Sequence, residues 1–259
     1  MSSVLKSVDE TPWTAPRVPW EWKTPPIPGL SLEGEIAMAL RLLHSKGYDD
    51  DYFGHITVHL DDGSMLTNPW EIIWDQVRAS DMVSCTVDGV KTGGRYSVSP
   101  GIGLHLPIRH YARDKSRARV IIHQHPRFST LWAIRQKVPP IYDQAGAWYT
   151  APLHMVGEFS AGEVMTREHA EAIVDCGWAL LARHGVVVLG SSVMEATWRA
   201  HWLEYRCRRA WELEGREGAV PMDEQLARES TSQVQSNYYQ QWWESEMHRQ
   251  VSIDPSVLL

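Results

Sequence analysis

Cysteine is scarce in this sequence, and the cysteines present are far apart. Cys85, Cys176 and Cys207 are an odd number and form no Cys-x-x-Cys pair. This pattern excludes the disulfide framework of a small secreted domain and a zinc site built from thiolates. We expect these thiols to be buried.

Long apolar runs and an excess of positive charge are also missing. No segment approaches the ~20 apolar residues of a membrane-spanning helix, and residues 1–20 lack the apolar stretch of a signal peptide. The formal net charge of -7 offers no field that would attract nucleic acid or an anionic membrane. Residues 205–209 (YRCRR) form the best basic cluster, which we interpret as a solvated helix face. We therefore expect a cytoplasmic protein that binds neither nucleic acid nor membrane.

The chain does have ample material for a folded domain. It is 43% hydrophobic and 22% charged over 259 residues, which suits one ordinary domain with a real core. Prolines and tryptophans crowd residues 1–30, where we expect an extended arm. A catalytic domain over 31–215 and a polar, helical tail over 216–259 complete the expected division. Five later tryptophans are interpreted as core or subunit contacts rather than pocket walls: Trp70, Trp74, Trp148, Trp242 and Trp243.

Apolar periodicity predicts a mixture of strands and helices. A helix begins at residue 31 and stops at Gly47, and another begins at a capping box on Ser192 and continues to about residue 213. Alternating residues on both sides of an Asp-Asp-Gly turn predict a hairpin over 54–67. The other expected elements are strands at 82–87, 120–123, 148–155, 178–182 and 186–189, and helices after 100, at 127–135, at 166–176 and in the tail.

Histidines at the ends of two predicted strands form the most suggestive pattern for chemistry. His123 and His125 lie two residues apart on a strand, so both imidazoles leave the same face, ~6.6 Å apart along the chain. His184 ends a later strand just before a glycine. Three neutral imidazoles with an open fourth position are the ligand set of a catalytic metal rather than a structural one. Spacing alone leaves open the alternative of ordinary core or surface histidines.

Several short motifs, taken in order, resemble those of the class II aldolase/adducin family from about residue 31 to residue 213. They are residues 54–58 (GHITV), 67–69 (TNP), 80–83 (SDMV), 104–106 (LHL), 123–126 (HQHP) and 181–185 (LARHG). The resemblance implies an α/β fold, namely a three-layer α/β/α class II aldolase-like domain with a largely antiparallel central sheet. It implies that His123, His125 and His184 hold a divalent metal ion in a homotetramer whose active site lies near a subunit interface. Zinc is the default ion for imidazole ligands, and Mn, Co and Fe are compatible with them.

The departures from the family pattern are equally informative. Family aldolases carry a glutamate general acid/base four residues before the position of His105, and this chain has Gly101 there. The positions that would match the family's phosphate contacts also differ, so a phosphorylated substrate is not expected. The side chains expected to contact a substrate are His55, Thr67, Asn68, Ser99 and His105.

The loss of the glutamate favours decarboxylation over aldol cleavage. Retro-aldol cleavage needs a base to take a hydroxyl proton, whereas departing carbon dioxide leaves its electron pair on the substrate, so that only a proton donor is required. We therefore predict a metal-dependent lyase that decarboxylates a non-phosphorylated hydroxy-aromatic or oxo-acid carboxylate. Tyr142 is the preferred proton donor and His154 the second candidate, while Arg127 is a candidate to bind a second carboxylate. Each of these three side chains could instead have a structural role.

Three other functions stay open at this point. A substitute base would allow retro-aldol cleavage of a small hydroxy-oxo acid. The same three histidines could hold Fe(II) for an oxygenase reaction. A non-enzymatic adducin-like interaction domain would need no metal, and the retention of all three histidines argues against it.

Overall fold

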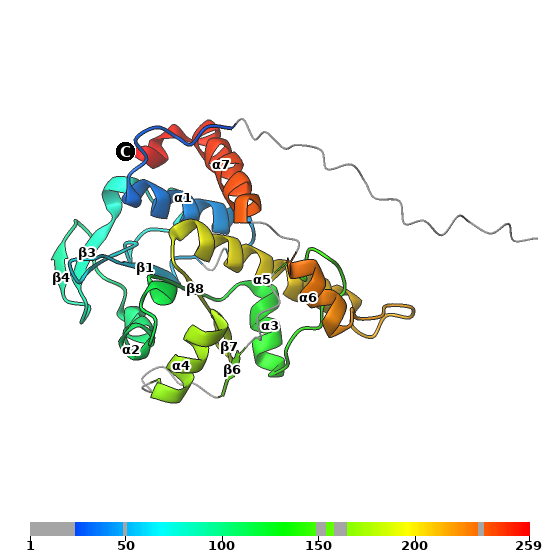
Figure 1. Ribbon diagram of the computed structural model, residues 1–259. Coiled ribbons are helices and arrows are strands. Elements are labelled where there is room, and N and C mark those ends of the chain that lie inside the picture. The colour runs from blue at the N-terminus through cyan, green and yellow to red at the C-terminus, as the bar shows by residue number, and fades with distance from the viewer. Residues whose placement is uncertain (1–23, 49–50, 149–153, 158–164, 233–235) are drawn as a thin grey trace, which may run out of the picture.

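A computed structural model describes residues 24–48, 51–148, 154–157, 165–232 and 236–259. The described residues form one eight-stranded sheet in the order β4-β3-β2-β1-β5-β8-β7-β6 (Figure 1). Every neighbouring pair is antiparallel except β6 and β7, which are parallel. The strands are β1 (His55–His59), β2 (Ser64–Thr67), β3 (Val83–Thr86), β4 (Lys91–Gly93), β5 (Val120–Gln124), β6 (His154–Val156), β7 (Trp178–Leu181) and β8 (Gly185–Gly190).

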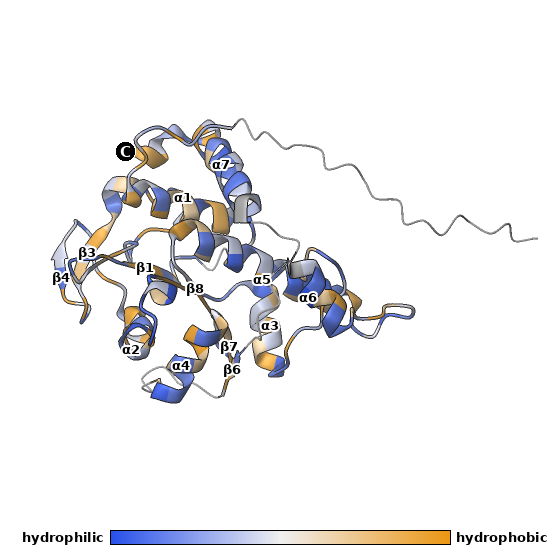
Figure 2. Ribbon diagram, in the orientation of Figure 1, coloured by the Kyte–Doolittle hydropathy of each residue, from blue (hydrophilic) through white to orange (hydrophobic). Residues whose placement is uncertain are grey.

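Helices lie on both faces of this sheet (Figure 1), and many of them carry both hydrophilic and hydrophobic residues (Figure 2). On β5 the side chains of Val120 and Ile122 enter one core, and Ile121 between them enters the other, because successive strand residues face opposite sides. The expected three-layer α/β/α fold with a largely antiparallel sheet is confirmed. The helices are α1 (Leu32–Ser45), α2 (His105–Tyr111), α3 (Arg127–Arg135), α4 (Arg167–Cys176), α5 (Val193–Leu213), α6 (Glu224–Ser232) and α7 (Ser236–Ile253).

Local capping explains where the longer helices begin. The Ser192 hydroxyl accepts a hydrogen bond from the backbone N–H of Glu195, and the Glu195 carboxylate accepts one from the backbone N–H of Ser191. Ser31 and Thr166 cap α1 and α4 in the same way. These contacts satisfy backbone donors that the first turn of a helix leaves unpaired, and they confirm the helix starts expected from the sequence.

The C-terminal helix is part of the main core. Trp243 and Met247 of α7 are buried there. Two ion pairs join α1 to this helix: Nζ of Lys46 lies 2.8 Å from Oε1 of Glu246, and Nη1 of Arg41 lies 2.6 Å from Oδ2 of Asp254 just beyond α7. The expected polar tail is therefore helical, but it also buries apolar surface on the domain that precedes it.

Some local expectations need correction. The strand expected over 148–155 begins at His154, residues 149–153 lie outside the described residues, and most of the expected arm over 1–30 does too. The prediction of a solvated helix face for the basic run is wrong at Arg206, which is buried and donates two hydrogen bonds to the carbonyl oxygen of Pro139. A buried guanidinium needs such acceptors because its charge has left water.

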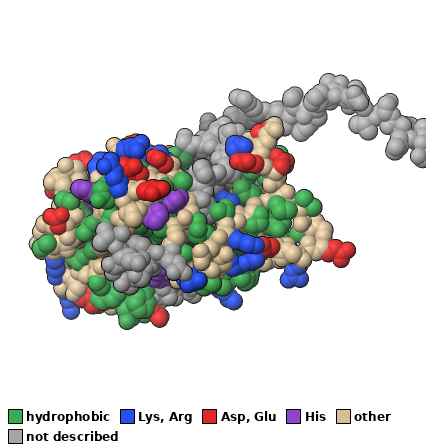
Figure 3. Space-filling view, turned by 90° about the horizontal axis from the view of Figure 1, so that it is seen from below, with side chains coloured by type: hydrophobic (Ala, Val, Ile, Leu, Met, Phe, Trp, Pro, Cys, Tyr) green, Lys and Arg blue, Asp and Glu red, His purple; other side chains and the backbone are tan. Residues whose placement is uncertain are grey.

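Other expectations about composition agree with the structure. Cys85 and Cys207 are buried and Cys176 is half-buried, and all three are free thiols. Trp74 and Trp243 are core residues. No helix in the described ranges is both long and apolar enough to cross a membrane. Figure 3 shows basic and acidic side chains interspersed over one face of the molecule.

Candidate metal centre

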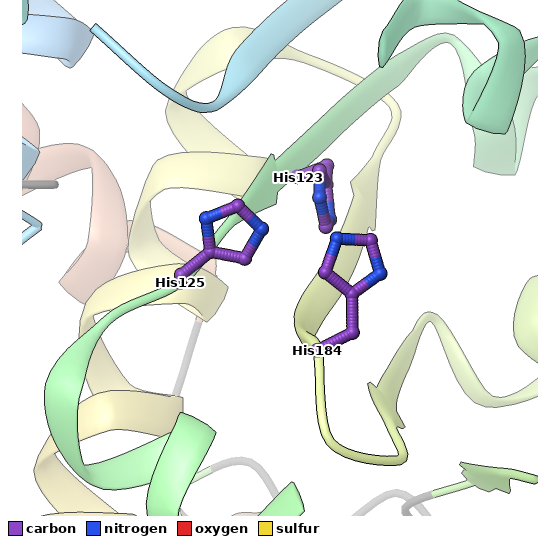
Figure 4. A group of neighbouring side chains, drawn as sticks. All are labelled: His123, His125 and His184. Carbon is purple, nitrogen blue, oxygen red and sulfur yellow. The ribbon is translucent and has the colours of Figure 1, made fainter. Parts of the chain in front are cut away.

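Three histidines from two neighbouring parts of the sheet converge on one point (Figure 4). His123 is in β5, His125 follows the end of that strand, and His184 lies in the turn between β7 and β8. One ring nitrogen of each histidine lies within 4.8 Å of those of the other two. The structure therefore brings together the three side chains predicted as metal ligands.

The pairing of β5 with β8 explains why these histidines meet. His123 is opposite Val187 and Gln124 is opposite Val186, so the end of β5 lies beside the turn that carries His184. In this turn Arg183 has a φ of 57°, a left-handed conformation that is unfavourable for a residue with a side chain. A Cβ at Gly185 would lie 2.5 Å from the Gln124 carbonyl oxygen and 2.6 Å from Cδ2 of the His125 ring, so only glycine fits there.

A hydrogen bond fixes the tautomer of His123. Its Nδ1 lies 2.9 Å from the carbonyl oxygen of Val186, and because a carbonyl can only accept, Nδ1 carries the hydrogen. The lone pair is then on Nε2, as a metal ligand requires. Burial lowers the pKa of His123 well below its usual value, and the nearby His55, His125 and His184 lower it further. The ring is therefore neutral at physiological pH.

The segment after His125 is held by a buried carboxylate from α5. Glu204 accepts hydrogen bonds from the backbone N–H groups of Phe128 and Ser129, at 2.7 and 2.9 Å, and from the Ser129 hydroxyl at 2.6 Å. These bonds satisfy the first backbone donors of α3, which begins two residues after His125. Burial raises the pKa of Glu204, and the hydrogen bonds oppose that rise.

The chemistry of these donors fits a divalent ion. Neutral imidazoles are good ligands for Zn and compatible with Mn, Co and Fe. Burial also lowers the pKa of His184, and His125 lowers it further, so this ring too favours the neutral form that a ligand needs. Among the described residues, the set of potential ligands consists of the three histidines and includes no carboxylate or thiolate. The positive charge of a bound ion would therefore not be neutralised by its ligands.

A second histidine pair lies directly beside this centre. The ring centroids of His55 in β1 and His123 are 5.0 Å apart. His55 Nδ1 lies 2.9 Å from Nε2 of His105, and Nδ1 of His105 lies 2.8 Å from the Thr57 hydroxyl. Both rings are buried, and burial is the largest cause that lowers the pKa of each well below its usual value.

Gly101 faces the same pair. A Cβ at this position would lie 2.3 Å from Nε2 of His55, which is much closer than two non-bonded atoms can approach. The His55 ring therefore occupies the space that a side chain at position 101 would need.

Two of the other expected substrate contacts support the backbone. The amide oxygen of Asn68 accepts from the N–H of Ile56, and its NH2 group lies 3.2 Å from the Pro69 carbonyl oxygen. The Ser99 hydroxyl accepts from the N–H of Gly101 at the start of a 3-10 helix over Pro100–Leu104. Thr67 is buried in β2 opposite Thr57. The predicted substrate contacts of these side chains stay predictions.

The three expected catalytic side chains are placed apart from one another. His154 lies in the same sheet row as Ala179, Val187 and His123, three strands from His123, or roughly 14 Å at about 4.8 Å per strand. The His154 ring lies near that of His169, with 6.0 Å between the ring centroids, and its role as a proton donor stays a prediction.

Tyr142 and Arg127 lie in different surroundings. Tyr142 is partly buried and packs against the main core. The Arg127 guanidinium lies 5.6 Å from the centre of the Phe128 ring, and Arg127 lines a hollow with His201 and Arg208. Their roles in catalysis stay predictions.

Sequence reasoning missed the residues that support the ligands. Glu204 lies far along the chain from α3, and Val186 contributes only a backbone carbonyl, so neither has a local signal. Thr57 could have been found, because it shares a strand face with His55 by period-two spacing.

Comparisons with known proteins agree with this architecture. The chain is 26% identical over 195 residues to the meiotically up-regulated gene 14 protein of Schizosaccharomyces pombe, covering 67% of this chain and 69% of that protein. It is 25% identical over 176 residues to the 3-oxo-tetronate 4-phosphate decarboxylase of Escherichia coli O6:H1, covering 64% of this chain and 79% of that enzyme.

Solved structures share the fold at low sequence identity. The L-fuculose 1-phosphate aldolase of Glaciozyma antarctica PI12 superposes with a TM-score of 0.75 at 17% identity, covering 90% of this chain and 96% of that one. An aldolase II superfamily protein of Pseudomonas syringae gives a TM-score of 0.76 at 19% identity, covering 87% and 94%. The pattern of the class II aldolase and adducin N-terminal domain matches residues 34–211, which is more than half of the chain. This match confirms the resemblance expected from the short motifs: the chain belongs to the class II aldolase/adducin family.

Proposed function

We propose that this protein is a divalent-metal-dependent carbon–carbon lyase that decarboxylates a hydroxy-aromatic or oxo-acid carboxylate without a phosphate group. The observation that carries the proposal is the pairing of three converging histidines with Gly101, whose side-chain space is filled by His55. The resemblance to family aldolases places their glutamate base at this position. Gly101 has no side chain that could take a proton, which suits a reaction that needs no base for its carbon–carbon cleavage.

The charge of the centre supports an anionic substrate. A bound divalent ion would supply a Lewis acid that stabilises negative charge developing on substrate oxygens. Imidazoles bind a metal in their neutral form, so these ligands would leave the positive charge of the ion available to a substrate. A carboxylate together with a neighbouring hydroxyl or keto oxygen matches this charge.

Two observations support a substrate without phosphate. The amide of Asn68 and the hydroxyl of Ser99 are both engaged with the backbone. The decarboxylase relative from Escherichia coli is named for a phosphorylated substrate, so the present protein would share its reaction class and differ in substrate.

An aromatic cluster immediately before β1 supports a flat substrate. Tyr52 and Phe53 stack with ring centroids 4.8 Å apart, and the Trp70 ring meets both edge-on at 5.5 and 6.1 Å. Tyr52 and Phe53 are partly exposed although they directly precede Gly54 and His55. Such a cluster suits either an aromatic substrate or a neighbouring subunit.

We propose further that the protein is a cytoplasmic homotetramer that uses zinc. Tyr142 would then protonate the product from an adjacent subunit, as the family resemblance implies. Sedimentation of the purified protein should give the mass of four chains, and a monomer would remove this route for Tyr142.

Metal analysis followed by a turnover screen tests the proposal. We expect about one zinc per chain, and release of carbon dioxide from hydroxybenzoate-type dicarboxylates that is equal with and without oxygen. A phosphorylated oxo acid should be a poorer substrate. Aldehyde release would favour retro-aldol cleavage instead, and iron with oxygen-dependent turnover would favour an oxygenase. A chain that takes up no metal would favour the interaction domain.

A further inference from the structure

The His55 ring is confined beside the candidate metal centre. Its register partner across the β1–β5 pair is His123, and the two ring centroids are 5.0 Å apart. The side chain is only 3% exposed, so it cannot turn out into solvent without opening the core. Its Nε2 atom lies close to Gly101, only 2.3 Å from the position that a Cβ of residue 101 would take.

The hydrogen bonds behind His55 decide which of its nitrogens carries the hydrogen. Thr57 is fully buried, and among the described residues its hydroxyl has one hydrogen-bond partner, Nδ1 of His105. A buried hydroxyl leaves its hydrogen unsatisfied only at a cost, so Thr57 donates and Nδ1 of His105 accepts. A neutral imidazole has one N–H group, which in His105 is then on Nε2.

The same reasoning extends one step to His55. His105 donates from Nε2 to Nδ1 of His55, across 2.9 Å. His55 consequently carries its own hydrogen on Nε2. Thr57, His105 and His55 thus form a hydrogen-bonded chain in which Thr57 donates to His105 and His105 donates to His55. The free end of this chain is the Nε2–H group of His55 beside Gly101, which is a hydrogen-bond donor and not an acceptor.

We propose that the Nε2–H group of His55 binds a second carboxylate of the substrate, one that lies beside the pair of oxygens facing the metal. The site then selects hydroxy or oxo acids with two carboxylates over those with one. A neutral N–H group can donate to a carboxylate, whereas a carboxylate side chain at position 101 would repel it. Arg127, the other candidate for this contact, lines a hollow with His201 and Arg208 on α5.

This inference rests on the metal centre of the proposed function, but it concerns binding and can be tested without turnover. The probes are glycolate, which has one hydroxyl and one carboxylate, and tartronate, which adds a second carboxylate on the same carbon. Isothermal titration calorimetry of the zinc-loaded protein should give tartronate at least a ten-fold lower Kd than glycolate, as expected for one hydrogen bond to a charged group. Equal Kd values would overturn the proposal.

Substitutions at position 55 identify the group responsible. His55→Leu should reduce the ratio of the two Kd values to below three-fold while leaving zinc content and the glycolate Kd unchanged. His55→Gln, which can still present an N–H group, should retain part of the ratio. The proposal fails if His55→Leu keeps the ratio, or if Arg127→Leu abolishes it.

Two glycines of the same 3-10 helix provide a matched pair of variants that leave His55 unmutated. A Cβ at Gly101 would collide with the His55 ring, whereas at Gly103 nothing lies within 4 Å. Gly101→Ala should therefore weaken tartronate binding about ten-fold relative to glycolate, and Gly103→Ala should leave both Kd values unchanged. Equal behaviour of the two variants would contradict the proposed place of the second carboxylate. A protein that discriminates tartronate but releases no carbon dioxide would remove the decarboxylase proposal and leave this one standing.

Discussion

Nδ1 of His123 lies 2.9 Å from the carbonyl oxygen of Val186 on the neighbouring strand, and this contact gives a buried histidine the orientation and tautomer that the proposed metal ligand needs. The carbonyl fixes the hydrogen on Nδ1 and leaves a lone pair on Nε2 that can bind a metal ion. The sheet therefore sets both the position of the ring and its protonation, because the same β5–β8 pairing also brings His184 alongside.

Removal of a single ligand should abolish metal binding. We expect His123→Ala and His184→Ala to purify as folded oligomers with less than a tenth of the wild-type zinc and with no turnover, because two imidazoles hold an ion far more weakly than three. Elemental analysis and circular dichroism check both points. His154→Ala is the matched control, since it lies in the same sheet row but three strands away, and its zinc content should be that of the wild type. Wild-type zinc content in His123→Ala would contradict the proposed centre.

A single methyl group at Gly185 should displace the second ligand. The added carbon would meet the Gln124 carbonyl oxygen at 2.5 Å and Cδ2 of His125 at 2.6 Å, so the strand or the ring must move. We expect Gly185→Ala to weaken zinc affinity by at least ten-fold, measured by competition with a chelator. Gly157→Ala serves for comparison, because nothing lies within 4 Å of that position. Unchanged affinity in Gly185→Ala would show that the turn relaxes without moving His125.

Glu204 should matter for stability although it is not a ligand. Replacement by Ala removes the acceptor of three hydrogen bonds and leaves buried donors at the start of α3, which we expect to cost roughly 2–4 kcal/mol of unfolding free energy. Glu204→Gln keeps one acceptor oxygen and should cost less. Denaturant unfolding provides the measurement.

The control for this prediction lies on the same helix. Glu212 of α5 forms exposed ion pairs with Arg208 and Arg209. Glu212→Ala should change the unfolding free energy by less than about 0.5 kcal/mol, as is usual for surface pairs. Similar losses in the Glu204 and Glu212 variants would contradict a special role for the buried carboxylate.

The sequence could predict the parts of this structure that have a local signal. Strand alternation placed His123 and His125 on one face, and the capping residues Ser192 and Thr166 marked the starts of α5 and α4. The convergence of His184 on the other two came from a family resemblance, because sequence spacing says nothing about which strands pair.

The remaining features depend on long-range packing. The burial of Arg206 inside a basic run results from a carbonyl supplied by Pro139, which no periodicity could indicate. The distance of His154 from His123 follows from the order of strands in the sheet. The steric clash between the His55 ring and any side chain at position 101 arises because the fold places β1 next to the 3-10 helix before α2, and the sequence does not indicate this contact.

Mild acid should destabilise the protein through His201. Burial, with a smaller contribution from Lys46, lowers the pKa of His201 from 6.5 to about 4. Below pH 6.5 the unfolded chain therefore binds a proton at His201 that the folded chain does not bind. The free energy of unfolding is unaffected by this residue above pH 6.5 and decreases progressively as the pH falls toward 4.

Between pH 7 and pH 5 this single group should remove up to about 2 kcal/mol of unfolding free energy. His201→Phe keeps a ring that can stack on Trp242, whose centroid lies 5.4 Å away, but it cannot titrate. Urea unfolding at the two pH values should show a smaller loss for His201→Phe than for the wild type, while the same exchange at the exposed His110 should leave the loss unchanged. If the wild type and His201→Phe lose equal stability between pH 7 and pH 5, His201 is not the buried neutral histidine that its packing against α7 indicates, and the acid sensitivity must come from other groups.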